Sequence, residues 1–307
     1  MRKLMLGLLV GLPPAFCLLG ADASYDGRWN IHVANEPRNR AWWLEVKGVK
    51  GRFVGAPGGG MYDIPHLSTK DGDLVFSFEG AQRRAPDEEY RAHLANGRLR
   101  GTLKAGKEYF EWTGLRAPEI TERDDGSWQP GEPIPLFNGF DLTGWKAMIP
   151  DKPLGWAVKE GSMTNVAGAN NLITTRRFWN YDLHAEFKVG ERSNSGIGLR
   201  GRYEVQILED FGKPPDSHGN GALYSRIVPS LNASKPAGEW QTFDIRLVGR
   251  DVTVVLNGKK IIDKGLIEGL TAVANNPDEG APGPLILQGD HGPVEFRKIA
   301  VTPLTKK

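Results

Sequence analysis

The sequence predicts an all-β protein, in which a small antiparallel barrel or sandwich precedes a larger two-sheet jelly roll. Three observations support this class. The 307 residues include 39 Gly and 21 Pro, so turns are frequent and strands are short. Apolar residues recur at every second position in several segments, which is the period of a half-buried strand. No long segment has the period of an amphipathic helix.

The first residues predict an export signal. Two basic residues, Arg2 and Lys3, precede an apolar stretch that ends near Leu19 and is followed by a small-x-small cleavage site. This order predicts a signal peptide at residues 1–23 and a periplasmic or secreted mature chain. A membrane anchor is the alternative, but a spanning helix needs roughly 20 apolar residues. The single cysteine, Cys17, would leave with the signal, so the mature chain has no thiolate nucleophile and no disulfide.

Residues 24–117 are predicted to form the small β unit. Apolar and polar residues alternate in three segments, and glycine-rich turns separate them. The alternating apolar residues are Trp29, Ile31 and Val33; Trp42, Leu44 and Val46; and Leu74, Phe76 and Phe78. The pattern indicates strands with one face in a core.

Residues 118–133 are predicted to be an extended linker, because their prolines fix φ and remove backbone donors. Residues 134–307 form the second unit. It contains further alternating segments, among them Leu183 to Val189 and Phe243 to Leu247, and an Asn257-Gly258 pair that predicts a tight hairpin. Many strands without a long helix indicate a two-sheet jelly roll.

Two neighbouring strands of the second unit share a polar face. Gly196, Gly198 and Arg200 point to one side of the first strand, and Glu204 and Gln206 point to the same side of the next. The glycines leave room above this face, as a sugar ligand would need. A solvated outer face with a salt bridge is the alternative interpretation.

Two loops carry histidines beside carboxylates. His218 lies in a Gly- and Pro-rich loop close to Asp216, and His291 follows Asp290 after a strand that ends at Gln288. Loops on a rigid sheet are where functional residues gather. A histidine beside a carboxylate can act as an acid or a base near neutral pH.

Missing motifs and the charge balance exclude several other functions. The chain has no Gly-x-Ser-x-Gly elbow, no phosphate-binding loop, no His-Glu-x-x-His helix and no Rossmann glycine fingerprint. The net charge of +2 is too balanced for an electrostatic nucleic-acid binder.

Several segments of the second unit occur in a characteristic order. They are Pro135 to Gly139, Leu142 to Trp145, Asn194 to Ile197 with Arg200, Tyr203 to Leu208, His218 to Tyr224, Gly238 to Gln241, Asn257-Gly258 and Gly283 to His291. This ordered set resembles the 3-keto-disaccharide hydrolase family over residues 134–303. The resemblance implies a concanavalin-like jelly roll and does not extend to residues 24–117.

The resemblance also implies an exported enzyme that cleaves 3-keto glycosides or disaccharides. A ketone at C3 acidifies the C2 proton, a base removes it, the enolate expels the C1 substituent, and water addition then gives net hydrolysis. The matching base and acid candidates are Glu204, Glu209, His218 and His291. The matching candidates for binding hydroxyls or the oxyanion are Arg200, Gln206, Tyr224, Gln288 and Asp290. No cofactor is identified, and a divalent cation is the alternative to Arg200 as the enolate stabiliser.

Two other functions stay open. One is a non-catalytic, lectin-like carbohydrate-binding protein, since the same fold serves lectins. The other treats the first unit as the working part, binding a lipid or polymer, with the second as its support. In the enzymatic interpretation the partner is a saccharide, and a separate dehydrogenase oxidises C3. No nucleic acid and no membrane span after signal cleavage are expected.

Overall fold

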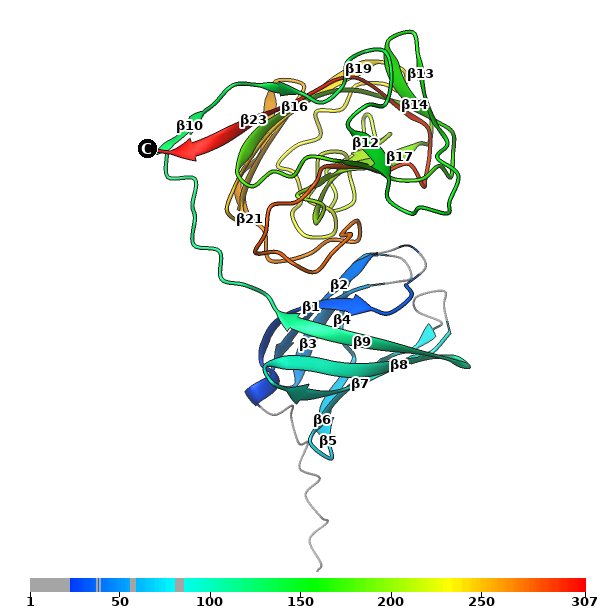
Figure 1. The fold of residues 1–307 in the computed structure, drawn as a ribbon, viewed down its shortest axis with the longest axis vertical. Helices are drawn as coiled ribbons and strands as arrows, with labels where there is room; N and C mark the ends of the chain where they lie inside the picture. The colour runs from blue at the N-terminus through cyan, green and yellow to red at the C-terminus, as the bar shows by residue number, and fades with distance from the viewer. Residues whose placement is uncertain (1–22, 37, 39, 56–58, 81–85) are drawn as a thin grey trace, which may run out of the picture.

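The computed structural model shows two β-rich units joined by a chain that runs along one side of the molecule (Figure 1). It describes residues 23–36, 38, 40–55, 59–80 and 86–307. The predicted signal peptide lies outside the described residues except for Ala23, which starts the 3-10 helix η1 (Ala23–Tyr25). In the described part of the chain, no helix is both long enough and apolar enough to cross a membrane.

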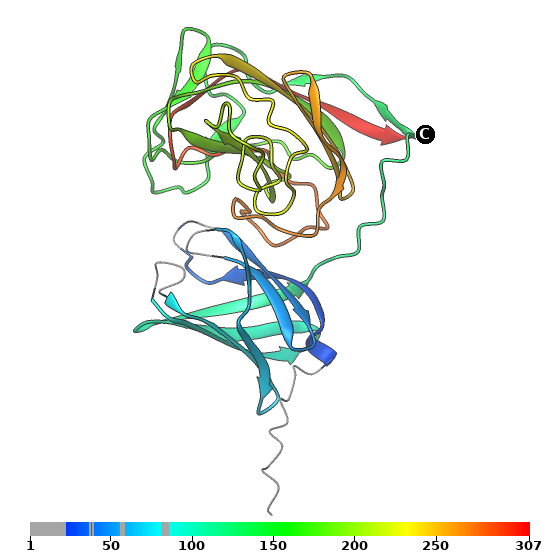
Figure 2. The same ribbon diagram turned by 180° about the vertical axis from the view of Figure 1, so that it is seen from behind.

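The first unit is a curled antiparallel sheet. Its strands are β1 (Gly27–Val33), β2 (Ala41–Lys47), β3 (Lys50–Val54), β4 (Met61–Asp63), β5 (His66–Lys70), β6 (Asp73–Phe78), β7 (Glu88–Ala95), β8 (Arg98–Ala105) and β9 (Glu108–Arg116). Their order is β4-β3-β2-β1-β9-β8-β7-β6-β5. Figure 2 shows the sheet rolled into a barrel. The interior is aromatic, with Phe76 and Tyr90 stacked at 4.4 Å between ring centroids.

The second unit is the predicted two-sheet jelly roll. Its strands are β10 (Trp128–Pro130), β11 (Ile134–Pro135), β12 (Trp145–Ala147), β13 (Trp156–Lys159), β14 (Ser162–Asn165), β15 (Leu172–Thr174), β16 (Tyr181–Val189), β17 (Asn194–Leu199), β18 (Tyr203–Leu208), β19 (Trp240–Val248), β20 (Asp251–Leu256), β21 (Lys259–Leu266), β22 (Ile286–Leu287) and β23 (Val294–Lys306). The larger sheet has the order β13-β14-β23-β16-β19-β20-β21, with β10 and β11 on β23, and the smaller has the order β12-β15-β22-β17-β18. The all-β prediction is confirmed.

The core of the jelly roll lies between its two sheets. The inward residues of the larger sheet include Phe187 and Phe243, whose rings stack at 4.8 Å. They pack in one cluster with Ile197 and Val205 of the smaller sheet. The predicted hairpin at Asn257-Gly258 joins β20 to β21, with both turn residues at positive φ. The opposite face of the smaller sheet does not take part in this core.

The chain between the units is docked on the jelly roll. Strand β10 pairs with β23. The indole Nε1 of Trp179 donates to Glu122 at 3.0 Å, and Arg123 pairs with Asp251 at 2.9 Å. These contacts give the chain between the units a defined path.

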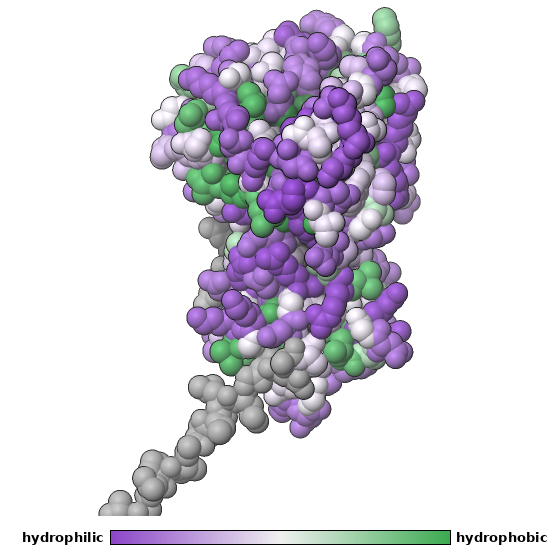
Figure 3. Space-filling model, turned by 90° about the vertical axis from the view of Figure 1, so that its left-hand side faces the viewer, coloured by the Kyte–Doolittle hydropathy of each residue, from purple (hydrophilic) through white to green (hydrophobic). Residues whose placement is uncertain are grey.

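One outer face of the barrel is also buried, because the jelly roll covers it. Alternation correctly places Trp42, Leu44 and Val46 in the barrel core. Trp43 points the other way, yet it is fully buried within the core cluster of the jelly roll, and Arg226 stacks on its ring at 4.3 Å. Figure 3 shows the two units in contact beneath a mostly hydrophilic surface.

A buried polar network forms a second link between the units. The Glu279 carboxylate accepts hydrogen bonds from Arg250 Nη1 at 2.7 Å and from the Tyr203 hydroxyl at 2.8 Å. Asn30 of strand β1 donates its Nδ2 to the same carboxylate at 2.7 Å. Because Glu279 is fully buried, its charge depends on these partners and on a second Arg250 contact, and the charges of Arg202 and Arg226 also act on it.

Replacing Glu279 with Gln should lower the free energy of unfolding by about 3–5 kcal/mol, because it leaves the Arg250 charge buried without a counter-ion. Urea denaturation measures this. Asp263→Asn is the control, since Asp263 forms an exposed pair with Lys260 and should cost less than about 1 kcal/mol. Equal losses in the two variants would contradict this role for Glu279.

Candidate functional site

The candidate site lies on the face of the smaller sheet that points away from the jelly-roll core. Strands β17 and β18 pair with Gly198 opposite Glu204 and Gly196 opposite Gln206. The alternate residues, such as Val205, belong to the core. The strand period therefore brings Glu204 and Gln206 to one face, as the sequence predicts.

The two glycines do not leave open space, contrary to the prediction. A Cβ on Gly196 would lie 2.5 Å from Oε1 of Glu204 and 3.0 Å from its Cγ. A Cβ on Gly198 would lie 2.8 Å from the Cβ of Ile286 and 3.1 Å from Val273. The space above Gly196 is thus filled by the Glu204 side chain, and an apolar cluster covers Gly198.

Glu204 is a buried carboxyl without a close partner. It is 2% exposed, and its side chain forms no hydrogen bond or ion pair with another described residue. Burial raises the pKa of Glu204 to about 7; the charges of Arg40 and His291 oppose the rise, and that of Asp290 adds to it. A carboxyl with such a pKa can take up or release a proton near neutral pH.

Two glutamines on the same face also have unused hydrogen-bonding capacity. Gln206 and Gln288 are 2% and 5% exposed, and the Oε1 of each has no partner in the described part of the chain. Gln206 donates its Nε2 to Asn194, and the backbone N–H of Gln288 donates to Gly196. Buried amide oxygens without donors are rare in folded proteins, so this face is built to receive a donor.

The loop after β22 brings Asp290 and His291 to this face. Asn171 holds the loop, because its Oδ1 accepts hydrogen bonds from the backbone of Gly289 at 2.8 Å and of Asp290 at 3.2 Å. The Nδ1 of His291 lies 2.9 Å from Oδ1 of Asp290. Burial acts to raise the pKa of Asp290, but the hydrogen bond with His291 and the charges of Arg40, His291 and Lys152 together lower it. Asp290 therefore stays ionised and orients the imidazole.

The segment after β18 brings Tyr224 to the same place and leaves His218 at its margin. The backbone N–H of Tyr224 donates to the Glu204 carbonyl at 3.0 Å. Burial and the charge of Glu204 raise the pKa of the Tyr224 hydroxyl. The exposed His218 ring packs edge-on against Tyr224 at 4.8 Å, and its Nδ1 lies 3.3 Å from Asp216. Among the described residues, His218 contacts this group through the ring of Tyr224.

The predicted place of Arg200 is wrong. Arg200 follows β17 with φ at +50°, which ends the strand and turns its side chain away from the polar face. Its guanidinium donates to the backbone carbonyls of Trp179 and Gly249 and stacks on the Trp179 ring at 4.1 Å. Arg200 is therefore a buried structural residue, and it is separate from Glu204.

Among the described residues, no hydrogen bond or ion pair joins Glu209 to Glu204. It lies beyond the end of β18, and its backbone contacts Ser193 and Lys213. The next residue, Asp210, is buried and accepts hydrogen bonds from Ser234 Oγ at 2.6 Å and the Asn220 backbone at 2.8 Å. Asp210 thus fixes the loop that carries His218.

Sequence analysis missed a site residue from the barrel. Arg40, which directly precedes β2, places its Nη2 2.6 Å from Oδ2 of Asp290. Its charge also acts on Glu204 and Tyr224, and Tyr62 of β4 acts on Tyr224. No local signal identifies Arg40, because its partner lies 250 positions along the chain.

In the described ranges, no group of three or more His, Cys, Asp and Glu side chains could hold a metal ion.

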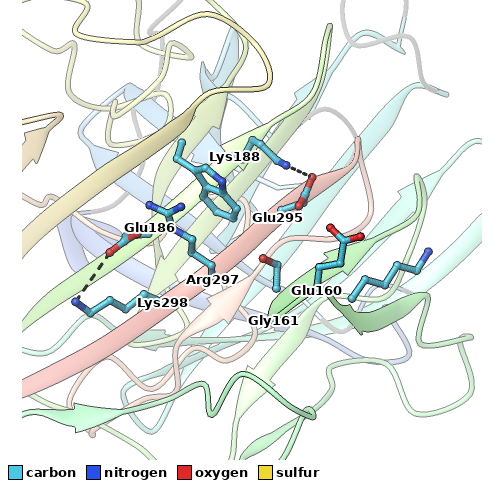
Figure 4. Close-up of a pocket in the computed structure, with 10 residues that line it drawn as sticks. Glu160, Gly161, Glu186, Lys188, Glu295, Arg297 and Lys298 are labelled. Atoms are coloured by element: carbon cyan, nitrogen blue, oxygen red, sulfur yellow. Dashed lines mark hydrogen bonds and ion pairs between the residues drawn. The ribbon is translucent and has the colours of Figure 1, made fainter.

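The hollow on the outer face of the larger sheet is a second polar region of the jelly roll. Figure 4 shows a hollow on the larger sheet, where Lys188 pairs with Glu295 at 2.7 Å. There, Arg297 and Lys188 lie over the Trp240 ring at 4.3 and 5.1 Å. These two cation–π contacts cover the indole that a sugar would otherwise stack on.

Comparison with known proteins identifies the family of the second unit. Residues 132–302 match the family described as the 3-keto-alpha-glucoside-1,2-lyase-like domain. The 3-keto-disaccharide hydrolase of Bacteroides thetaiotaomicron is 24% identical over 166 residues, which are 42% of this chain and 57% of that protein. The chain therefore spans little more than half of this curated relative.

Two crystal structures of proposed glycosyl hydrolases from Parabacteroides distasonis are also similar. One is 27% identical, covers 61% of this chain and 92% of the other, and has a TM-score of 0.49. The second is 23% identical, covers 56% and 94%, and has a TM-score of 0.48.

The raised pKa of Glu204 predicts a pH-dependent gain in stability for Glu204→Gln. The unfolded carboxyl ionises near 4.5 and the folded one near 7, so the cost of Glu204 grows between these values and is complete above about pH 7. Thermal and urea unfolding at pH 8 should show a gain of up to about 3 kcal/mol, which shrinks toward pH 4.5. Glu186→Gln is the control, because the pKa of Glu186 is lowered. A pH-independent difference would contradict the burial of an ionisable Glu204.

Proposed function

The chain belongs to the 3-keto-alpha-glucoside-1,2-lyase-like domain family, and on that premise we propose that it is an exported enzyme that cleaves the glycosidic bond of 3-keto glycosides. Cleavage begins with removal of the C2 proton and ends in elimination or, after water addition, in net hydrolysis. The one observation that carries the proposal is Glu204, a buried carboxyl with a pKa of about 7 and no hydrogen-bond or ion-pair partner for its side chain in the described part of the chain.

Glu204 is the base of this reaction. Its carboxylate takes the C2 proton, and the electrons of the C2–H bond move into an enolate on C2, C3 and the C3 oxygen. The enolate then re-forms the ketone and a C1–C2 double bond as the C1–oxygen bond breaks. A base with a pKa near the working pH is the most effective one for such a step. Addition of water across the double bond completes hydrolysis.

His291 is the acid that protonates the leaving oxygen. Its contact with the ionised Asp290 fixes the orientation of the ring. The charge of His291 is felt by Glu204, so that base and acid lie in one site. This pair differs from the two carboxylates of an oxocarbenium glycosidase, because the first proton comes from carbon.

Gln206 and Gln288 recognise the sugar hydroxyls. Their free amide oxygens accept hydrogen bonds from hydroxyl groups, and a site with unpaired buried acceptors rejects ligands that lack the donor. Tyr224 adds a hydroxyl beside Glu204. The carboxyl, two amides and phenol of this face are groups that form hydrogen bonds with the hydroxyls of a sugar ring.

Export and substrate supply follow from the same proposal. The basic start and apolar stretch within residues 1–23 have the order of a signal peptide and support a periplasmic or secreted enzyme. N-terminal sequencing of the native protein tests whether it begins near Ser24. The substrate carries a C3 ketone, so a separate dehydrogenase must oxidise the sugar first.

Glu204→Gln should abolish cleavage of a 3-keto disaccharide, with a loss of at least about 10³-fold in kcat, because proton abstraction needs the carboxylate. For the wild type, kcat/KM should rise with pH and level off above about pH 7, since Glu204 must be ionised. Chromatography measures the product, and NMR in D₂O measures exchange at C2. Glu295→Gln, in the outer hollow, is the control. Undiminished exchange in Glu204→Gln would overturn the assignment.

The same incubation separates the enzyme from a lectin. A non-catalytic carbohydrate-binding protein would bind oxidised and unoxidised disaccharide without product. The proposed enzyme should cleave only the oxidised sugar, because only a C3 ketone acidifies the C2 proton. Binding without cleavage of either sugar would overturn the enzymatic function.

His291→Asn should affect substrates according to their leaving groups. An alkyl aglycone needs a proton as it leaves, so the variant should lose about 10²-fold or more in kcat. A nitrophenyl aglycone leaves without one and should lose far less. His184→Asn is the matched control, because His184 also pairs with a carboxylate, Asp244, at 2.7 Å, but on the larger sheet and away from the candidate site. Equal losses on both aglycones would show that His291 is not the acid.

A further inference from the structure

The barrel meets the jelly roll beside the candidate site. The backbone N–H of Ala41 donates to Ala274 at 2.8 Å, and that of Met61 donates to the Ser225 hydroxyl at 2.8 Å. Ser225 directly follows Tyr224 in the sequence. The end of the barrel that carries β2 and β4 is therefore fixed next to the group of residues around Glu204.

Arg40 is the barrel residue that this contact buries. Its side chain is 7% exposed, and its Nη2 pairs with Asp290, whose other oxygen is held by His291. The Nε of Arg40 is buried and has no partner among the described residues. A guanidinium has five donors, so one ion pair leaves Arg40 with capacity to spare.

Arg40 faces Glu204 without pairing with it. Both residues are described, and no ion pair joins them, although the charge of Arg40 acts on the Glu204 carboxyl. A base and a cation that are close but not in contact can hold a substrate group between them. In a 3-keto sugar the acidic C2–H and the C3 oxygen are on adjacent atoms, so one ring can meet both groups.

The jelly roll does not offer Arg200 for this role. Arg200 was expected to stabilise the enolate, but its guanidinium is bonded to Trp179 and Gly249. Lys152, whose charge reaches Asp290, donates its Nζ to the Ala169 carbonyl at 2.8 Å. The family match begins at residue 132 and so does not include the barrel.

We propose that Arg40, from the barrel, completes the active site by donating hydrogen bonds to the C3 oxygen of the substrate as that oxygen becomes an enolate. This inference rests on the proposed function. As Glu204 takes the C2 proton, negative charge moves to the C3 oxygen, where the guanidinium stabilises it, and no bond to Arg40 forms or breaks. The barrel is then a catalytic part of the enzyme and not an accessory domain.

The test uses the full chain with Arg40→Ala, Arg40→Lys and the control Arg38→Ala. Arg38 lies in the same segment, and among the described residues its side chain pairs with Glu36, two positions away. Arg40→Ala should lower kcat on a 3-keto disaccharide by about 10²–10³-fold, the usual loss for one oxyanion donor. The kcat of Arg40→Lys should lie between those of Arg40→Ala and the wild type, because lysine keeps the charge but lacks the planar guanidinium and its paired donors. Arg38→Ala should match the wild type.

Two readouts separate this role from a structural one. Arg40→Ala should move the acidic limb of kcat/KM to higher pH, because Glu204 loses its cation while Asp290, His291 and Tyr224 remain around it. Added guanidinium ion should restore part of the kcat of Arg40→Ala. Thermal unfolding of each variant shows whether it is folded. A folded Arg40→Ala with undiminished kcat, or with no pH shift and no rescue, would overturn the proposal.

Calorimetric titration of the same variants with the 3-keto disaccharide keeps the two proposals distinguishable. If the wild type binds the sugar without cleaving it, the proposed function fails. A tenfold or greater loss of affinity in Arg40→Ala would then still support a subsite at Arg40, and unchanged affinity would overturn it. If the wild type neither binds nor cleaves the sugar, both proposals are overturned.

Discussion

The structure of the site depends on one constraint: the Glu204 carboxyl is buried and has no ion-pair partner in the described part of the chain. Asp290 makes this possible, because its two oxygens engage Arg40 and His291 separately. Arg40 and His291 are thus both bound to Asp290, and neither forms an ion pair with Glu204 in the described part of the chain. If Asp290 were absent, the Arg40 guanidinium could move onto Glu204 and lower its pKa.

The same constraint explains why Gly196 faces Glu204. The carboxyl lies so close over Gly196 that any side chain there would displace it. The sequence predicted room for a ligand above this glycine, and that space is filled by the Glu204 side chain. A glycine in a strand indicates a close approach, but the sequence does not say which group approaches.

Short-range patterns predicted much of the architecture and part of the site. Alternation correctly placed Glu204 and Gln206 on one face, because both lie within a regular strand. It failed for Arg200, where the left-handed backbone ends the period. It could not find Arg40 or explain Trp43, since their partners belong to the other unit. Contacts between units depend on docking, for which no local sequence period exists.

The two polar regions of the jelly roll show what distinguishes a site from a charged surface. In the outer hollow, Glu186 and Glu295 are paired with lysine and arginine side chains, and water screens what remains. Around Glu204, the buried carboxyl and two buried amide oxygens have no donor among the residues that the structure describes, which costs stability in the free protein. Such a cost persists only where the surrounding packing enforces it and a ligand removes it. The proposed chemistry therefore lies on the smaller sheet, next to the barrel, although the more open and more charged surface lies on the larger one.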